Sequence, residues 1–222
     1  MAYGEGLAKL SPCSPELICS LAGKYNCGGG EVLDLGCGRG ERLWELMRCY
    51  SNWRFAGVDI DPDMANMAKS ALPEADIRCC DAELLPFEDG KFSLVICECS
   101  LSLFDRPEKC LAEAYRVLAE GGALILGDII GRSLGDACTE SCGGDILGRI
   151  RSKGGIERMA AGAGFKTVSY DDRSADLTAM AAQMIFDGSI CDCLGSGGAA
   201  MLRRVKAGYG LWIFGKEEFC HV

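Results

Sequence analysis

The segment VLDLGCGRG, residues 32–40, decides the fold of this chain. It ends an apolar strand with an acidic residue, Asp34, and continues into a turn with glycine at every second position, at Gly36, Gly38 and Gly40. A dinucleotide-binding turn has a different glycine spacing and directs a helix N-terminus at a pyrophosphate. Because a carboxylate beside that pyrophosphate would repel it, the segment predicts a nucleotide pocket for a cationic ligand.

One ligand that meets this description is S-adenosylmethionine (SAM). It contains a nucleoside but no phosphate, and it carries a sulfonium and an ammonium group. An opposite charge nearby favours an ionised carboxylate, so Asp34 and such a ligand would stabilise each other. The segment therefore favours SAM as the cofactor.

The composition of the chain limits its class. With 222 residues, of which 49% are hydrophobic and 25% charged, it is long enough to bury one core, so we expect a single domain over residues 1–222. Residues 1–10 lack a basic start followed by a long apolar run, and no stretch approaches the roughly 18 apolar residues of a membrane span, which predicts a cytoplasmic protein without membrane contact. The net charge of -9 argues against nucleic acid as a partner and favours a small or cationic substrate.

Cysteine is unusually frequent, with 15 residues, whereas histidine occurs once, at His221 near the C-terminus. Disulfide scaffolds belong to small secreted domains, so we expect reduced thiols here. Four of them lie in or beside strand-like segments, where a free cysteine packs as a small hydrophobic residue: Cys79, Cys80, Cys97 and Cys99. The histidine is expected to lie in a solvated tail rather than in a catalytic site.

Strand-like and helix-like segments alternate along the chain, a pattern typical of a parallel sheet covered by helices on both faces. We therefore predict an α/β, doubly wound, mostly parallel seven-stranded sheet of Rossmann-like type with an antiparallel last strand. The predicted strands are Glu31–Leu35, Trp53–Val58, Asp76–Cys80, Phe92–Cys97, Ala123–Asp128, Phe165–Tyr170 and Tyr209–Phe214.

Capping residues and prolines predict the helix starts, at Ser14-Pro15, Asp61-Pro62 and Asp105 to Glu108. The helix that carries Tyr115, Val117 and Leu118 is expected to close at Glu120-Gly121-Gly122. In the second half, Leu177, Met180, Ala181 and Met184 recur at helical spacing and predict a core-facing stripe. Residues 31–128 are thus the expected cofactor-binding core, and residues 131–150 and 187–207 the expected substrate-side loops.

Acidic residues follow three successive strands, which is where a ligand binds in an open parallel sheet. Asp34 follows the first, Asp59 the second and Asp81 the third. Asp59 is placed to accept hydrogen bonds from both ribose hydroxyls, and Asp81 with Ala82 to accept one from the adenine amino group. Glu98, Cys99 and Ser100 follow the fourth strand, nearest to the expected place of the transferred group.

Five stretches carry a family resemblance: Val32–Gly40, Gly57–Asp59, Cys80–Phe87, Phe92–Val95 and Arg116–Gly122. Together they resemble the ordered motifs of class I SAM-dependent methyltransferases, with most similarity to the UbiE and arsenite methyltransferase-like branch and to an uncharacterised anaerobe group. The resemblance implies that Asp34, Gly36 and Gly38 hold the methionine part, Asp59 the ribose, and Asp81 with Ala82 the adenine. The candidate cofactor-binding residues are therefore Asp34, Gly36, Cys37, Gly38, Gly40, Asp59, Ile60, Met64, Asp81, Ala82 and Glu98.

Beyond Asp128 the resemblance is weaker. Glu140–Gly144 resembles the segment in which arsenite methyltransferases place a metalloid-binding cysteine. That family has a second binding cysteine just after the glycine-rich turn, where this chain has Glu41-Arg42-Leu43-Trp44. No resident metal is expected, but five thiols are candidates for contact with the substrate: Cys13, Cys138, Cys142, Cys191 and Cys193.

The shortage of histidine bears on the reaction. Methyl transfer from a sulfonium needs alignment and exclusion of water more than acid–base groups. A hydroxyl acceptor would need Glu98, Asp128 or a tyrosine as its base, whereas a thiolate, a metalloid or an activated carbon would need none. Glu98 and Cys99 are the candidate catalytic residues, and the acceptor is expected to be a small molecule, with a thiol or a metalloid such as arsenite favoured.

Several alternatives remain open on the sequence alone. The acceptor could instead be a quinone or other ring carbon, or the protein could bind SAM without transferring its methyl group. An NAD-dependent oxidoreductase would also explain a doubly wound start, but Asp34 and the glycine spacing disfavour it. The oligomeric state cannot be inferred from these residues.

Overall fold

The computed structural model describes residues 11–26, 28–135, 149–186 and 202–216. The sheet has seven strands: β1 Glu31–Leu35, β2 Arg54–Asp59, β3 Asp76–Cys79, β4 Phe92–Glu98, β5 Leu118–Gly131, β6 Lys166–Asp172 and β7 Ala207–Gly215. The helices are α1 Pro15–Tyr25, α2 Glu41–Cys49, α3 Pro62–Ala71, the 3-10 turn η1 Leu101–Leu103, α4 Pro107–Val117, α5 Lys153–Gly162 and α6 Ser174–Phe186.

The strand order is β3-β2-β1-β4-β5-β7-β6, and β7 is antiparallel to both of its neighbours. The other pairs are parallel, because crossovers return the chain to the same end of the sheet, through a helix after β1, β2 and β4 and through a segment without a helix after β3. The predicted mostly parallel seven-stranded sheet with an antiparallel last strand is therefore confirmed. In this order, the carboxyl ends of β3, β2, β1 and β4 lie next to one another.

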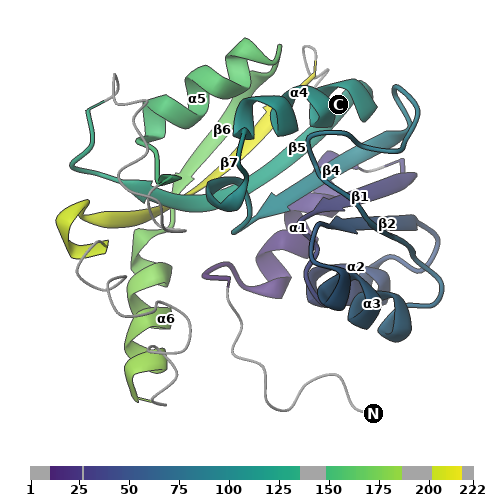
Figure 1. The fold of residues 1–222 in the computed structure, drawn as a ribbon, viewed down its shortest axis with the longest axis horizontal. Helices are drawn as coiled ribbons and strands as arrows, with labels where there is room; N and C mark the ends of the chain where they lie inside the picture. Colours follow the sequence, from purple (N-terminus) through teal and green to yellow (C-terminus); the bar gives the residue numbers. More distant parts are fainter. Residues whose placement is uncertain (1–10, 27, 136–148, 187–201, 217–222) are drawn as a thin grey trace.

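Helices cover both faces of the sheet, with α4 and α5 on one side and α1, α2 and α3 on the other (Figure 1). Side chains alternate along each central strand: Leu94 and Ile96 of β4 join the core under α1–α3, while Val95 and Cys97 join the core under α4 and α5. Because these strands are buried on both faces, their sequences read as continuous apolar runs.

The start of β5 differs from the prediction. The preceding helix α4 ends at Val117, and Leu118, predicted to be helical, is already strand and pairs with Phe92. Leu118 is fully buried, so it is held in the sheet rather than in an exposed last turn. Regular pairing resumes at Ala123 opposite Leu94, after an irregularity that includes Gly121 at φ 70°.

Helix caps follow the predictions in two of three places. Ser14 caps α1 by accepting from the N–H of Leu17 at 3.3 Å, and Asp61 caps α3 by accepting from the N–H groups of Asp63 and Met64. Asp105 does not cap α4; it forms an ion pair with Arg149, at 2.5 Å between Oδ1 and a guanidinium nitrogen.

Helix α6 runs away from the sheet and has few neighbours among the described residues (Figure 1). Of the stripe predicted there, Met184 is buried and Leu177 packs against the core, but Met180 and Ala181 are only half-buried. No helix in the described ranges is long and apolar enough to cross a membrane.

Candidate active site

The glycine-rich turn joins β1 to α2 in a conformation that glycine adopts most readily. Gly36, Gly38 and Gly40 have φ values of 70°, 53° and 84°. The N–H groups of Gly36 and Cys37 both donate to the carbonyl of Val58 at 2.9 Å, which fixes the turn to the end of β2.

The three glycines differ in their surroundings. A Cβ on Gly36 would lie 2.6 Å from the Ser100 hydroxyl oxygen, and one on Gly40 would lie 2.6 Å from a methyl group of Leu72. A Cβ on Gly38 would meet nothing within 4 Å. The turn is therefore closely packed on two sides and open at Gly38, where a ligand can approach the backbone.

Asp34 lies at the end of β1 between Gly57 of β2 and Ile96 of β4, and its side chain is buried. Burial raises the pKa of this carboxyl to about 8, and the nearby charge of Glu98 acts in the same direction. The sequence predicts a fixed anion here, and its burial disfavours the ionised form in the absence of a ligand. A cation bound beside it would favour the ionised form.

Asp59 ends β2 directly beside the turn. One carboxylate oxygen accepts from the Gly38 N–H at 2.8 Å, and the other accepts from the Asp61 N–H at 2.9 Å. Its neighbour Ile60 is 69% exposed, which is unusual for an apolar side chain, while Met64 on α3 is half-buried. The structure thus brings Asp59 to the open side of the turn with an apolar surface next to it.

Asp81 follows β3, and its chain is tied to β2 because the N–H of Cys80 donates to the Asp59 carbonyl at 3.0 Å. One carboxylate oxygen of Asp81 accepts from the Glu83 N–H at 2.9 Å, and Ala82 between them is buried. Since β1, β2 and β3 are adjacent, Asp34, Asp59 and Asp81 lie at one edge of the sheet, in the predicted order.

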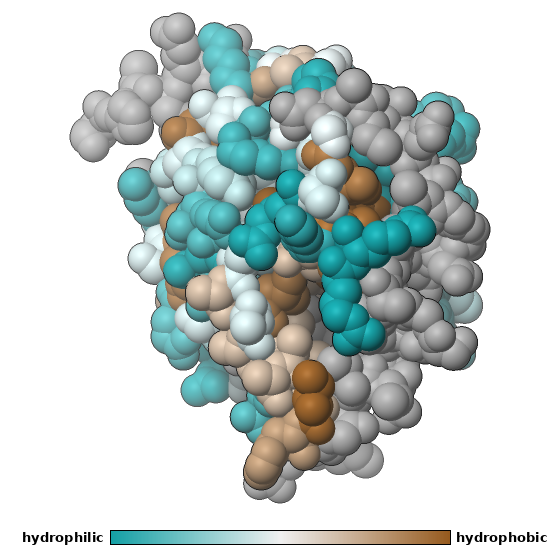
Figure 2. Space-filling view, turned by 90° about the vertical axis from the view of Figure 1, so that its left-hand side faces the viewer, coloured by the Kyte–Doolittle hydropathy of each residue, from teal (hydrophilic) through white to brown (hydrophobic). Residues whose placement is uncertain are grey.

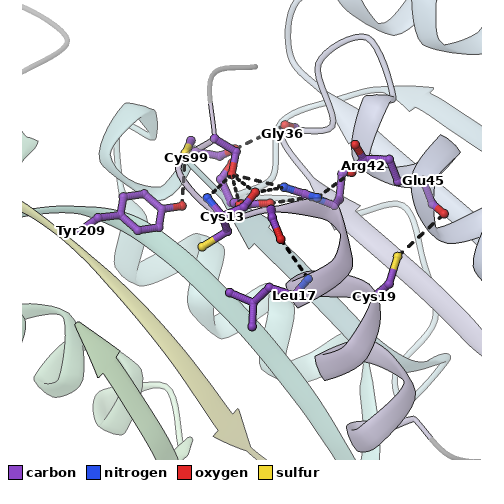
Figure 3. Close-up of polar contacts among 12 residues, drawn as sticks. Cys13, Leu17, Cys19, Gly36, Arg42, Glu45, Cys99 and Tyr209 are labelled. Carbon is purple, nitrogen blue, oxygen red and sulfur yellow. Dashed lines mark hydrogen bonds and ion pairs between the residues drawn. The ribbon is translucent and has the colours of Figure 1, made fainter. Parts of the chain in front are cut away.

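Glu98 ends β4 and is held by a residue that sequence reasoning missed. The Arg42 guanidinium, from the first turn of α2, donates to a Glu98 carboxylate oxygen at 2.7 Å, and both side chains are largely buried (Figure 3). The other Glu98 oxygen accepts from the Ser11 hydroxyl. Arg42 also donates to Glu45 at 2.6 Å and to the Cys13 carbonyl at 3.3 Å.

Charge balance explains why this buried cluster is tolerated. Burial acts to lower the pKa of Arg42, but the charges of Glu98 and Glu45 outweigh that effect and raise it. The guanidinium therefore stays charged and neutralises part of the acidic site. The position of Arg42 directly after the glycine turn places it near the predicted pocket. Its pairing with Glu98, 56 positions away, cannot be predicted from neighbouring residues.

Cys99 and Tyr209 meet beside Glu98. Cys99 has φ 56°, a conformation uncommon outside glycine, and its sulfur lies 3.2 Å from the Tyr209 hydroxyl (Figure 3). Burial raises the pKa of the Cys99 thiol and of the Tyr209 phenol well above their usual values. Cys13 also faces this cluster, and burial, with Glu98 next in size, raises its pKa to about 12. All three groups are therefore neutral at physiological pH.

Asp128 is not available as a base. Its carboxylate accepts from the N–H of Ser102 at 2.7 Å, from the Ser102 hydroxyl at 2.8 Å and from the Ile129 N–H at 2.6 Å. Burial raises the pKa of Asp128 to about 6, although these hydrogen bonds oppose the shift. Its role in the structure is to hold η1 against β5.

The remaining predicted thiols, Cys138, Cys142, Cys191 and Cys193, lie outside the described residues, as does His221. Within the described ranges, no group of three or more histidine, cysteine or acidic side chains is arranged to hold a metal ion.

The chain is similar in sequence to known proteins. Residues 33–126 match the family model described as a methyltransferase domain. A ubiquinone/menaquinone biosynthesis C-methyltransferase, UbiE, from Desulfotalea psychrophila is 37% identical over 100 residues, which cover 44% of this chain and 41% of that protein. The chain spans less than half the length of the first curated relatives that it matches, between 30% and 44%.

Solved structures show the same fold over nearly the whole chain. The [4+2]-cyclase SpnF covers 96% of this chain and 86% of its own, with a TM-score of 0.69 at 21% identity. Geranyl diphosphate C-methyltransferase from Streptomyces coelicolor, solved with Mg²⁺, geranyl diphosphate and S-adenosyl-L-homocysteine, covers 91% of this chain and 80% of its own, with a TM-score of 0.71 at 16% identity. This chain therefore has the Rossmann-like methyltransferase fold, and its residues 33–126 are similar to a methyltransferase domain.

Proposed function

We propose that this protein is a SAM-dependent methyltransferase that acts on a small-molecule acceptor. The observation that carries the proposal is the row of Asp34, Asp59 and Asp81 at adjacent strand ends, around a glycine turn that is open at Gly38. The match of residues 33–126 to the methyltransferase domain supports it. We further propose that residues 1–222 act as one domain, with the cofactor-binding core at 31–128.

The residues present fit SAM. Asp34 is a buried acid that a neighbouring cation would ionise and attract, and the turn leaves the backbone accessible at Gly38 for the methionine part. Asp59 would hold the ribose hydroxyls, with the exposed Ile60 and the half-buried Met64 against the base. Asp81 and Ala82 would hold the adenine amino group, and Glu98 would lie nearest to the transferred methyl.

SAM supplies a methyl group bound to a sulfonium, and the thioether that remains is a leaving group that needs no added acid. The protein's part is to align the acceptor and exclude water. None of the described side chains near Glu98 is a free base, because Glu98 is held by Arg42 and Ser11, and Cys99 and Tyr209 are neutral. We therefore propose an acceptor that is nucleophilic without a protein base, such as a thiol or a metalloid, that contacts Glu98 and Cys99.

A ring-carbon acceptor is the second candidate. The similarity to a ubiquinone/menaquinone C-methyltransferase favours it. A quinol whose hydroxyl ionises readily has a nucleophilic ring carbon and therefore also needs little basic assistance. The apolar exposed side chain of Leu103, at the end of η1, offers a surface that a ring could contact.

The fold alone does not establish methyl transfer, because one similar structure is described as a [4+2]-cyclase. SAM binding and methyl transfer must therefore be measured separately. Calorimetry with SAM and with S-adenosylhomocysteine tests the pocket, and formation of S-adenosylhomocysteine from SAM with thiols, arsenite, quinols and amines tests the reaction.

We expect binding of both ligands and turnover with the thiol or arsenite. Turnover with quinols alone would shift the proposal to ring-carbon methylation. Binding without turnover of any acceptor would contradict the methyltransferase proposal, and absence of binding would contradict the cofactor assignment as well.

A further inference from the structure

Two thiols that the proposed reaction does not use meet where α1 packs on α2. Cys19 lies in the middle of α1, and Cys49 is the last residue of α2. The Cys49 thiol is placed to donate to the Cys19 sulfur, at 3.0 Å between the two Sγ atoms. The two residues are 30 positions apart in the chain, so the contact is made by packing of the helices and not by local sequence.

The surroundings hold the two sulfurs in place. The Tyr50 hydroxyl donates to the Cys19 carbonyl at 2.8 Å. The Cys19 thiol is 3.8 Å from the Glu45 carbonyl oxygen, and Figure 3 shows these two residues facing each other. Tyr50 reaches α1 because Gly23 has no side chain; a Cβ there would lie 2.2 Å from the Tyr50 oxygen. The helices therefore cannot shift apart without breaking these contacts.

The two thiols differ in access. Cys49 is exposed, whereas Cys19 is buried. Burial, followed by the hydrogen bond with Cys49, raises the pKa of Cys19 to about 12. A disulfide reagent in solution would therefore react first at the exposed Cys49. The Cys19 sulfur then lies close enough to attack the mixed disulfide formed at Cys49.

We propose that Cys19 and Cys49 form a redox-active pair that closes to a disulfide when the protein meets a small-molecule disulfide. The Cys49 thiolate attacks one sulfur of the reagent, forms a mixed disulfide and releases the first reagent thiolate. The Cys19 sulfur, which loses its proton to solvent, then attacks Cys49 and releases the second thiolate. Two protein thiols are oxidised and one reagent disulfide is reduced to two thiols.

Bond formation needs little movement. A disulfide requires about 2.05 Å between sulfurs, roughly 1 Å less than the present contact, which adjustment of the two side chains can supply. The bond would tie α1 to α2. These helices hold the site together, because residues 11–14 ahead of α1 contact Arg42 and Glu98, and Arg42 belongs to α2. Oxidation would thus stabilise the packing around Glu98.

The test compares reduced protein with protein treated with oxidised glutathione, using non-reducing peptide mapping and thermal unfolding. We expect a Cys19–Cys49 peptide that has lost two hydrogens, and a rise in Tm of about 5–10 °C that dithiothreitol reverses. Cys49→Ser and Cys19→Ser should each abolish both effects. Cys79→Ser, which removes another exposed thiol, should retain them.

The mapping also separates this pair from the other cysteines of the chain. Recovery of Cys49 as a stable mixed disulfide with glutathione, with Cys19 still a free thiol, would overturn the proposal. So would an equal Tm rise in Cys49→Ser, a variant whose altered side chain is exposed and whose folding is therefore not at risk.

Discussion

The two halves of the molecule are built differently. In residues 31–128, polar side chains stand at the strand ends and are fixed by hydrogen bonds; Asp59, Glu98 and Asp128 are wholly or partly buried, whereas Asp81 is exposed. In the described part of residues 129–222, α6 has one buried side chain, Met184, and ends in the exposed Ile185 and Phe186. Figure 2 shows apolar atoms at the lower end of this face, where α6 ends.

This difference suggests that the first half binds the cofactor and that the second half determines the choice of acceptor. A rigid first half can hold a constant cofactor, because its donors and acceptors are positioned before the ligand arrives. In the second half, β7 is buried in the sheet, but α6 has few contacts and therefore can vary without loss of the fold, as segments that carry substrate choice often do. The predictions below test whether cofactor binding and acceptor choice separate in this way.

The largest effect is expected in the buried ion pair of the first half. Arg42→Gln leaves Glu98 buried without its charged partner, so we expect the free energy of unfolding to fall by about 3–5 kcal/mol. Adding Glu98→Gln should recover much of that loss. Denaturant unfolding of the two single variants and the double variant measures the coupling.

Arg54→Gln is the matched control. It breaks the ion pair with Glu31, in which the Arg54 side chain is 79% exposed, and should change stability by less than about 1 kcal/mol. Equal losses of unfolding free energy in Arg42→Gln and Arg54→Gln would show that the buried Arg42–Glu98 pair contributes no more to stability than an exposed ion pair.

Next in size is Asp34→Asn. Without an ionisable group, the pocket loses its attraction for a cation, and we expect SAM affinity to fall about 100-fold, or about 2.7 kcal/mol. Calorimetry measures this, with Asp61→Asn as a control that removes an exposed carboxylate and keeps a capping side chain.

The pH dependence gives an independent check on Asp34. Its pKa is raised from 3.8 in the unfolded chain to about 8, so between these values the native state binds more protons than the unfolded state. Its contribution to stability is present below about pH 4 and is lost as pH rises toward 8, and Asp34→Asn should remove that slope. At pH 7, SAM binding should release close to one proton in the native protein and none in the variant.

A smaller effect separates two glycines of the same turn. Gly36→Ala places a Cβ against Ser100 at φ 70°, so we expect a loss of stability of about 1–3 kcal/mol. Gly38→Ala meets open space and should cost about 1 kcal/mol for its φ of 53°. Although Gly38→Ala should lose less stability than Gly36→Ala, calorimetry should show the larger loss of SAM affinity in Gly38→Ala. A larger loss of SAM affinity in Gly36→Ala would refute a ligand surface at Gly38.

The smallest effect on stability is expected in the second half. Phe186 is 86% exposed, so Phe186→Ser should change the free energy of unfolding by less than about 0.5 kcal/mol and leave SAM affinity unchanged. If α6 belongs to the acceptor side, the KM for the acceptor should rise several-fold. Met67→Ser, an exposed apolar residue on α3, should leave that KM unchanged, and equal behaviour of the two variants would contradict the division between the halves.

Local patterns were sufficient to predict the strands, the glycine turn and the acidic residues after β1, β2 and β3. Each of these depends on a few consecutive residues, because period-2 burial and glycine φ preferences act over short range. The start of β5 was wrong because Leu118 is drawn into the sheet by Phe92, which is distant in sequence. Arg42 with Glu98, Cys99 with Tyr209 and Cys19 with Cys49 were also beyond prediction, because each pair joins segments that meet only after folding.

The sequence by itself determined the architecture and the placement of acids at the strand ends, since both follow from hydrophobic pattern and turn chemistry. Only the tertiary structure decided the state of those groups: that burial raises the pKa of Asp34, that Glu98 is paired, and that burial raises the pKa of the Cys99 thiol. Ionisation depends on burial and on every charge nearby, and these are properties of the packed molecule rather than of any one segment.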